Sequence, residues 1–268
     1  MGVMLEIKNL MVFYENALAL NDFNLELREG EFVSVLGSNS AGKTTLMNTV
    51  SGLIQDMKVK EDRKGGVRIT VLGEIFFQGE KILKTKPKHR VKKGIVLARE
   101  RHPIYRDSNV MENLRIAGYL QKDDEVKERS DFVFNLFPQL TKLRDRKAGF
   151  LSGGEQQMLI IAMALVAKPK LLLLDEPLLG LSPMLQAHLV EAMKNINREG
   201  ITLLVTEQFA RPLLPYIDRG YILENGMLTL TGTGEELMNN PECFEPLFRS
   251  LRARLPGFME PPFRIPVG

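Results

Sequence analysis

The feature that most restricts the fold of this chain is one short segment between two regular elements. It reads Gly37-Ser38-Asn39-Ser40-Ala41-Gly42-Lys43-Thr44 and matches the pattern G-x-x-x-x-G-K-[ST]. An apolar run, 32–36, precedes it, and a run with helical character, 44–50, follows it. A strand, a glycine-rich turn and a helix in this order form a phosphate-binding loop. The segment therefore predicts an α/β fold with a phosphate-loop core.

Each part of this loop has a physical role in holding a polyphosphate. Gly37 and Gly42 let the backbone turn with its N–H groups inward, and the following helix N-terminus adds a positive dipole. We expect Lys43 to reach the β- and γ-phosphates of ATP and the Thr44 hydroxyl to bind Mg²⁺. The remaining nucleotide contacts are expected from Ser38, Asn39, Ser40, Ala41 and Thr45.

Two acids follow a second apolar run, which consists of four leucines, 171–174. Such a run is typical of a parallel strand that is buried on both faces, and ligands bind at the carboxyl ends of such strands. Asp175 is therefore expected to hold Mg²⁺, and Glu176 to act as the general base toward the attacking water. The alternative is a strand that simply ends in a polar turn, which the nearby phosphate loop disfavours.

Composition limits the kind of protein. Of 268 residues, 44% are hydrophobic and 26% are charged, as in ordinary soluble domains. The single cysteine, Cys243, excludes an internal disulfide and fits a reducing cytoplasm. A net charge of +3 is too small to favour nucleic acid as a partner. We expect neither a signal peptide nor a transmembrane segment, since no uncharged apolar run approaches about 18 residues.

Lysine and arginine are concentrated between Lys81 and Lys93. Two interpretations stay open: a solvated basic face, or a surface facing anionic lipid headgroups. The run contains no aromatic residue, which argues against stacking on single-stranded nucleic acid.

Hydrophobic periodicity divides the chain into regions. The stretches 5–12, 23–27 and 67–77 favour strands of a small antiparallel sheet. The stretch 110–143 favours helices, with Asn109 or Ser108 as the first cap, and predicts a helical subdomain over about 107–150. Helix 153–167, strand 171–175, helix 184–198 and strand 201–205 then alternate, with Gly200 ending the last helix, and this order indicates parallel pairing.

A family resemblance follows from five motifs in this order. After the phosphate loop come Leu151-Ser152-Gly153-Gly154-Glu155, the leucine strand with Asp175-Glu176-Pro177, and the segments 179–183, 205–208 and 218–226. Over residues 3 to 240 the chain resembles the ATP-binding subunits of ABC transporters. More narrowly, it resembles the second ATPase subunit of branched-chain amino-acid importers.

The resemblance implies roles that the residues alone do not. Tyr14 matches the aromatic residue that stacks on adenine; the alternative is a strand-end aromatic packed on the small sheet. Ser152, Gly153, Gly154 and Glu155 match the signature that closes on the nucleotide of another chain, although this segment could also be a simple helix cap. One phosphate loop and one signature per chain imply two chains stacked head to tail, with two shared ATP sites.

The chain departs from the family pattern at several places. Gln208 occupies a position that is His in most members, and it joins Glu176 and Lys43 in the expected catalytic set. Pro183 replaces the usual Asp. The family usually has a Gln in the segment that couples to the membrane subunit. Glu100, next to Arg99, is its expected equivalent in this chain. The segments 55–66 and 244–268 lie outside the usual pattern.

The resemblance thus predicts an ABC ATPase domain over 1–240 and a C-terminal extension over 241–268, which is either a docking arm or without fixed structure. It implies ATP hydrolysis that drives import at the cytoplasmic face of the cell membrane, with a second ATPase subunit and two membrane permease subunits. Three alternatives stay open: an importer of urea, amides or another small polar solute, a soluble ABC ATPase that moves no solute, and a unit that binds ATP without hydrolysing it.

Overall fold

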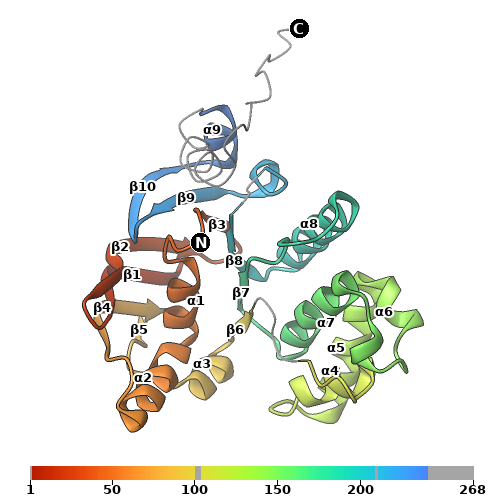
Figure 1. The fold of residues 1–268 in the computed structure, drawn as a ribbon. Coiled ribbons are helices and arrows are strands. Elements are labelled where there is room, and N and C mark those ends of the chain that lie inside the picture. The colour runs from red at the N-terminus through yellow and green to blue at the C-terminus, as the bar shows by residue number, and fades with distance from the viewer. Residues whose placement is uncertain (1, 100–103, 209–210, 241–268) are drawn as a thin grey trace, which may run out of the picture.

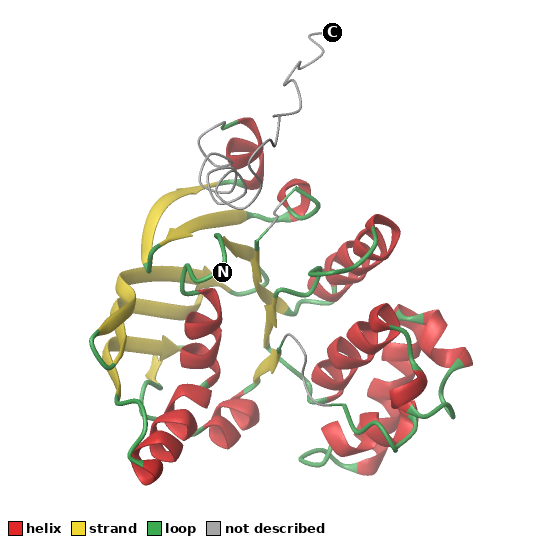
Figure 2. Ribbon diagram, in the orientation of Figure 1, coloured by secondary structure: helices red, strands yellow, loops and turns green. Residues whose placement is uncertain are grey.

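The chain forms two β-sheets with helices around them (Figures 1 and 2). The computed structural model describes residues 2–99, 104–208 and 211–240. The first sheet is antiparallel, with strand order β2-β1-β4-β5. Its strands are β1 (Val3–Tyr14), β2 (Ala17–Arg28), β4 (Ile69–Phe77) and β5 (Glu80–Lys81). The small antiparallel sheet predicted from the sequence is therefore confirmed. Strands β1 and β2 are longer than expected, and β4 begins two residues later than expected.

The second sheet has six strands in the order β10-β9-β3-β8-β7-β6. All neighbouring pairs are parallel except β9 with β10. Its strands are β3 (Phe32–Leu36), β6 (Ile95–Ala98), β7 (Leu171–Asp175), β8 (Thr202–Glu207), β9 (Arg219–Glu224) and β10 (Met227–Gly232). The predicted parallel pairing is confirmed. Strand β8 extends two residues beyond the predicted end, because the polar Thr206 and Glu207 find hydrogen-bond partners inside the fold.

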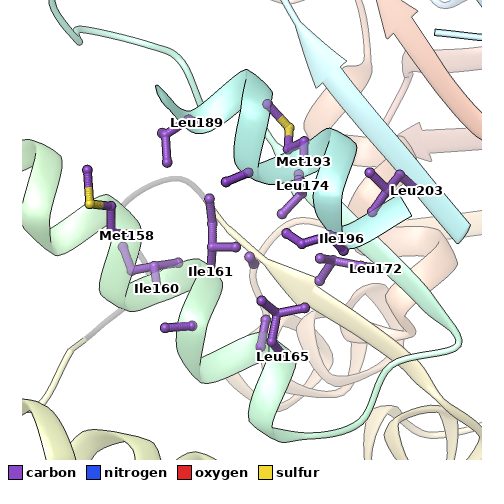
Figure 3. Close-up of a cluster of buried hydrophobic side chains, with 14 of the residues drawn as sticks. Met158, Ile160, Ile161, Leu165, Leu172, Leu174, Leu189, Met193, Ile196 and Leu203 are labelled. Carbon is purple, nitrogen blue, oxygen red and sulfur yellow. The ribbon is translucent and has the colours of Figure 1, made fainter. Parts of the chain in front are cut away.

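Strand β7 lies at the contact between two hydrophobic cores. Leu171 and Leu173 belong to the core under the antiparallel sheet and helix α1 (Lys43–Ser51), whereas Leu172 and Leu174 belong to the other core. Figure 3 shows the second core, where Leu172 and Leu174 meet side chains of α7 (Gly153–Val166) and α8 (Pro183–Arg198). The four leucines are fully buried, as expected for a central strand covered on both faces.

Helices α4 (Val110–Ala117), α5 (Asp123–Leu136), α6 (Pro138–Lys142) and α7 pack together beside the six-stranded sheet (Figure 1). Asn109 caps α4: its side-chain Oδ1 accepts the N–H of Glu112 at 2.8 Å, and its own N–H donates to Glu112 Oε2 at 2.8 Å. The predicted cap at Asn109 is confirmed, and the helical content predicted for 110–143 is present.

Four short elements are also present in the described part of the chain: α3 (Pro87–Lys93), α9 (Gly234–Asn239), and the 3₁₀ turns η1 (Ala148–Phe150) and η2 (Leu214–Tyr216). The segment 55–66, which departs from the family pattern, is largely helix α2 (Leu53–Lys64), which ends at Gly65 with a positive φ of 63°. Among the described residues, no helix has the length and apolar character needed to cross a membrane. The predicted extension 241–268, with Cys243, lies outside the described residues.

The prediction of a solvated basic face over 81–93 is wrong for Arg90, which is 0% exposed. Its guanidinium donates hydrogen bonds to five backbone carbonyl oxygens, those of Thr49, Val50, Ile82, Leu83 and Thr85. Burial lowers the pKa of Arg90 to about 10. Two further members of the run, Lys81 and Lys93, form ion pairs with Glu74 and Glu80. The arginine therefore ties the end of α1 to the segment before α3.

Candidate nucleotide-binding site

The register of the six-stranded sheet brings three strand ends together. Leu36 at the end of β3 pairs with Glu207 at the end of β8, and Asp175 at the end of β7 pairs with Thr206. The phosphate loop follows β3 directly, and its first N–H, that of Gly37, donates to the backbone oxygen of Glu207 at 3.2 Å. The loop and the two acids therefore share the carboxyl edge of the sheet, where open α/β sheets bind ligands.

Glycine is required at both ends of the loop. A Cβ added at Gly37 would lie 2.3 Å from the carbonyl oxygen of Leu223, and one at Gly42 would lie 2.6 Å from that of Ala19. Gly42 also has a φ of 111°, which L-residues with side chains rarely adopt. Helix α1 begins at the next residue, Lys43, so its free N–H groups lie at the loop.

The ammonium group of Lys43 is buried inside the loop. It donates to the carbonyl oxygens of Gly37 at 2.7 Å and Ser38 at 2.9 Å, and it lies 2.9 Å from Glu176 Oε1. The side chain of Lys43 is 3% exposed and that of Glu176 is 11% exposed. Two residues 133 positions apart in the sequence thus form a shielded ion pair at the end of the sheet.

Asp175 lies beside the first turn of α1. Its Oδ1 accepts a hydrogen bond from Thr206 Oγ1 at 2.8 Å and lies 3.5 Å from Thr44 Oγ1. Burial raises the pKa of Asp175, and the hydrogen bonds from Thr206 and Thr44 oppose this rise. A hydroxyl and a carboxylate are hard oxygen ligands of the kind that Mg²⁺ prefers, so these residues fit a magnesium site.

The described residues contain no group of three or more His, Cys, Asp or Glu that could hold a metal ion. A site with one hydroxyl and one carboxylate leaves most positions of an octahedral ion to phosphate oxygens and water. The arrangement therefore suits an ion that arrives with a nucleotide.

A cavity of about 440 Å³ opens over the loop. Its lining combines residues of the phosphate loop and the start of α1 with Glu176 and two flanking positions: Ala19, Asn39, Ser40, Gly42, Lys43, Thr44, Thr45, Glu176 and Leu179. The structure thus brings six of the nine residues 37–45 to one cavity together with Glu176, whereas Gly37, Ser38 and Ala41 are not part of its lining. Tyr14 is not part of this lining. It ends β1 and packs, half-buried, against the core under the antiparallel sheet, so its contact with adenine stays a prediction.

Glu207, the last residue of β8, was not predicted as a site residue from the sequence. Its side chain is almost fully buried, and its Oε1 accepts the N–H of Leu178 at 2.7 Å. Burial raises the pKa of Glu207 to about 8, with the backbone hydrogen bond from Leu178 opposing and the nearby Glu176 adding to the rise. The signal was present in the sequence, because an acid follows the apolar run 201–205, just as Asp175 follows the leucines.

Of the remaining residues singled out in the sequence, those that the structure describes lie outside the cavity lining. Gln208 directly follows β8 and is half-buried, so its catalytic role stays a prediction. Glu100 lies outside the described residues, and Arg99 beside it is exposed. Pro183 is the first residue of α8, a position that suits its fixed φ and missing N–H.

The signature residues form the N-terminus of α7 and do not line the cavity. Ser152 Oγ accepts the N–H of Glu155 at 3.4 Å, and Glu155 Oε2 accepts the N–H of Ser152 at 2.7 Å. Ser152 and Gly153 are exposed, whereas Gly154 packs against α8, where an added Cβ would lie 2.5 Å from Leu185 Cδ1. Helix α7 thus presents an exposed N-terminus outside this cavity, and the predicted contact of the signature with another chain's nucleotide stays a prediction.

The parallel sheet, the glycine-bounded loop and the acids at the strand ends together define a phosphate-loop nucleotide-binding domain. The model of the ABC transporter family matches residues 20–179, more than half of the chain. The chain therefore belongs to the ABC transporter family, as one of its ATP-binding ATPase domains.

Similar proteins extend this finding over almost the whole chain. The high-affinity branched-chain amino acid transport ATP-binding protein BraG of Pseudomonas aeruginosa is 36% identical over 239 residues, which cover 89% of this chain and 97% of BraG. The probable branched-chain amino acid transport ATP-binding protein LivF of Archaeoglobus fulgidus is 33% identical, covering 91% of this chain and 98% of LivF. A solved ATP-binding cassette of an ABC transporter in its ADP conformation superimposes with a TM-score of 0.78 at 25% identity, covering 92% of this chain and 99% of that one.

Proposed function

We propose that this chain is the ATP-hydrolysing subunit of an importer for branched-chain amino acids, and that it works as the second of two ATPase subunits. The observation that carries the proposal is the cavity over the phosphate loop, where Lys43, Thr44 and Glu176 meet beside Asp175. The solute is inferred from BraG and LivF, whose lengths this chain covers almost completely.

In this proposal the phosphate loop binds ATP through its backbone N–H groups, the N-terminus of α1 and the ammonium of Lys43. Thr44 and Asp175 would hold Mg²⁺, which neutralises charge on the β- and γ-phosphate oxygens when bound. Water attacks the γ-phosphorus in line with the bond to ADP, that bond breaks, and the carboxylate of Glu176 accepts a proton of the water. Gln208, at the end of the neighbouring strand, can donate an amide hydrogen bond to a phosphate oxygen.

The position of the signature supports a working dimer. Ser152 and Gly153 are exposed at the start of α7, and the cavity of the same chain is lined without them. We infer that this helix N-terminus completes the nucleotide site of a second ATPase chain, either a homologue or another copy, while that chain's signature completes the site described here. Binding of ATP then draws the two chains together, and hydrolysis releases them.

An apolar groove of about 630 Å³ supplies a surface for the membrane subunits. It lies between the nucleotide core and the α4–α7 block, and its lining includes Arg99, in the segment that the family resemblance assigns to coupling. Its lining includes the exposed Tyr105 and Tyr119, the latter 69% exposed. We infer that a cytoplasmic loop of a permease subunit occupies this groove, which would hold the chain at the cytoplasmic face of the membrane.

Reconstitution tests the proposal directly. The chain is assembled in proteoliposomes with its partner ATPase, two permease subunits and solute-binding protein, with ATP and Mg²⁺ on the side of the ATPases. We expect ATP-dependent uptake of radiolabelled leucine, isoleucine and valine, and none with the Glu176→Gln variant. Uptake of urea or short amides in place of these amino acids would overturn the solute assignment, and ATPase activity without a copurifying permease would overturn the transport role.

A further inference from the structure

Glu207 holds two segments of the nucleotide site at once. Its backbone oxygen accepts the N–H of Gly37, where the phosphate loop begins, at 3.2 Å. Its side-chain Oε1 accepts the N–H of Leu178 at 2.7 Å. The residue is 3% exposed and belongs to β8, which pairs with β3 on one side and β7 on the other. Both anchors therefore come from one rigid, buried strand end.

The segment held by the side chain carries the proposed general base. Glu176 has a φ of 49°, in the left-handed region that costs energy for a residue with a side chain. Its N–H donates to the carbonyl oxygen of Thr206 at 3.0 Å, and the Leu178 carbonyl accepts a hydrogen bond from Gln186 Nε2 of α8 at 3.2 Å. Hydrogen bonds thus hold the turn on both sides of Glu176: one from its own N–H, and one at the Leu178 carbonyl. The side chain of Glu207 adds a third, from the N–H of Leu178.

We propose that Glu207 is a positioning residue for ATP hydrolysis, and that its side chain fixes the turn of Glu176 relative to the phosphate loop. The proposal rests on the proposed function, in which Glu176 accepts the proton from water. A displacement of about 1 Å at a reacting group can lower a rate about 100-fold. Without the carboxyl acceptor the N–H of Leu178 is left buried and unpaired, so the turn is expected to shift and Glu176 to move with it.

The same geometry predicts that hydrolysis and binding respond differently. The phosphate loop is tied to Glu207 by the backbone oxygen, which no substitution of the side chain removes. Lys43 and the loop N–H groups therefore stay in place when the side chain changes. Loss of the side chain is expected to lower kcat while leaving the affinity for ATP nearly unchanged, a division that general destabilisation does not produce.

The test compares three variants in the assembled transporter. Glu207→Leu removes the acceptor at similar size, and Glu207→Gln keeps an oxygen acceptor for Leu178. Thr202→Val is the matched control, because Thr202 lies at the other end of β8, is also buried, and its Oγ1 accepts the N–H of Gly30 at 2.9 Å. The measurements are phosphate release at saturating ATP, binding of a fluorescent ATP analogue, and hydrogen exchange at the Leu178 amide.

We expect Glu207→Leu to lower kcat at least about 10-fold, to change the dissociation constant of the analogue less than about 3-fold, and to speed exchange at Leu178. Glu207→Gln should restore most of the lost kcat, and Thr202→Val should melt at a lower temperature with kcat unchanged. Three outcomes would overturn this inference while leaving the proposed function intact. They are a parental kcat in Glu207→Leu, a loss of ATP-analogue binding in Glu207→Leu as large as its loss of kcat, and an equal loss of kcat in Thr202→Val. An inactive parent transporter would overturn the proposed function and the inference with it.

Discussion

The buried carboxyl of Glu207 should make the stability of the chain fall as pH rises. The ordinary pKa of a Glu side chain is 4.5, and burial raises that of Glu207 to about 8 in the folded chain. Below pH 4.5 the group is protonated whether the chain is folded or not, so it has no effect on the pH dependence. Between these two values the unfolded chain releases the proton while the folded chain keeps it, so folding becomes less favourable.

The size of the effect follows from the same two values. Each pH unit inside the window removes about 1.36 kcal/mol of unfolding free energy. Between pH 5.5 and 7.5, Glu207 therefore lowers the free energy of unfolding by about 3 kcal/mol. Above about pH 8 both states are ionised and the loss levels off. The side chain of Gln cannot titrate, so the Glu207→Gln variant lacks this pH dependence of the unfolding free energy. Asp175, whose pKa is also raised, adds the same pH dependence to parent and variant, so its effect cancels in the comparison.

Urea unfolding of the nucleotide-free chain, followed by circular dichroism, measures the difference. Parent and Glu207→Gln are unfolded at pH 5.5, 6.5 and 7.5, and the free energy of unfolding is extrapolated to water at each pH. The advantage of the parent over the variant should shrink by about 3 kcal/mol across the series. Two curves that stay parallel would refute the reasoning, because they would mean that Glu207 ionises in the folded chain much as it does in water.

Three further predictions concern other residues. Glu176→Gln should bind a fluorescent ATP analogue with a dissociation constant within about 3-fold of the parent, yet release phosphate at least about 100-fold more slowly. Phosphate release at the parental rate would show that Glu176 is not the general base. Lys43→Ala should weaken binding of the same analogue at least about 10-fold, since it removes the buried ammonium from the loop; unchanged affinity would contradict the phosphate-loop assignment. Arg90→Met removes five hydrogen bonds to backbone carbonyl oxygens, three of which keep a second donor, and should lower the free energy of unfolding by about 3 kcal/mol in urea. An unchanged midpoint would show that water replaces the guanidinium.

The sequence predicted the structure correctly where residues close to one another in the chain determine it. The leucines 171–174 predicted a strand buried on both faces, because nothing in that run could face water. Asn109 or Ser108, standing just before a stretch with helical periodicity, predicted a helix start, and the structure shows that Asn109 is the cap. The phosphate-loop pattern likewise required its strand and helix, since its glycines fit only a tight turn next to other backbone.

The sequence was less informative where the partner of a residue is distant. Arg90 stands among lysines, and only the folded chain brings the carbonyls of Thr49 and Val50, 41 and 40 residues away, to its guanidinium. The position of Glu207 after an apolar run was a local signal, but its hydrogen bond could not be predicted, because its partner Leu178 is 29 positions away in the turn after β7. The hairpin of β9 and β10 did carry a local signal in Asn225 and Gly226, both with positive φ, which is typical of a two-residue turn.

The four leucines of β7 point alternately into the two cores, and this affects how the chain unfolds. Because successive side chains of one strand fill different cores, neither core can open without exposing half of β7 to water. The antiparallel sheet and the α7–α8 layer are thereby joined by a shared strand rather than by a linker. We therefore expect the described part of the chain to melt in a single calorimetric transition, with the backbone amides of β7 among the last to exchange with solvent.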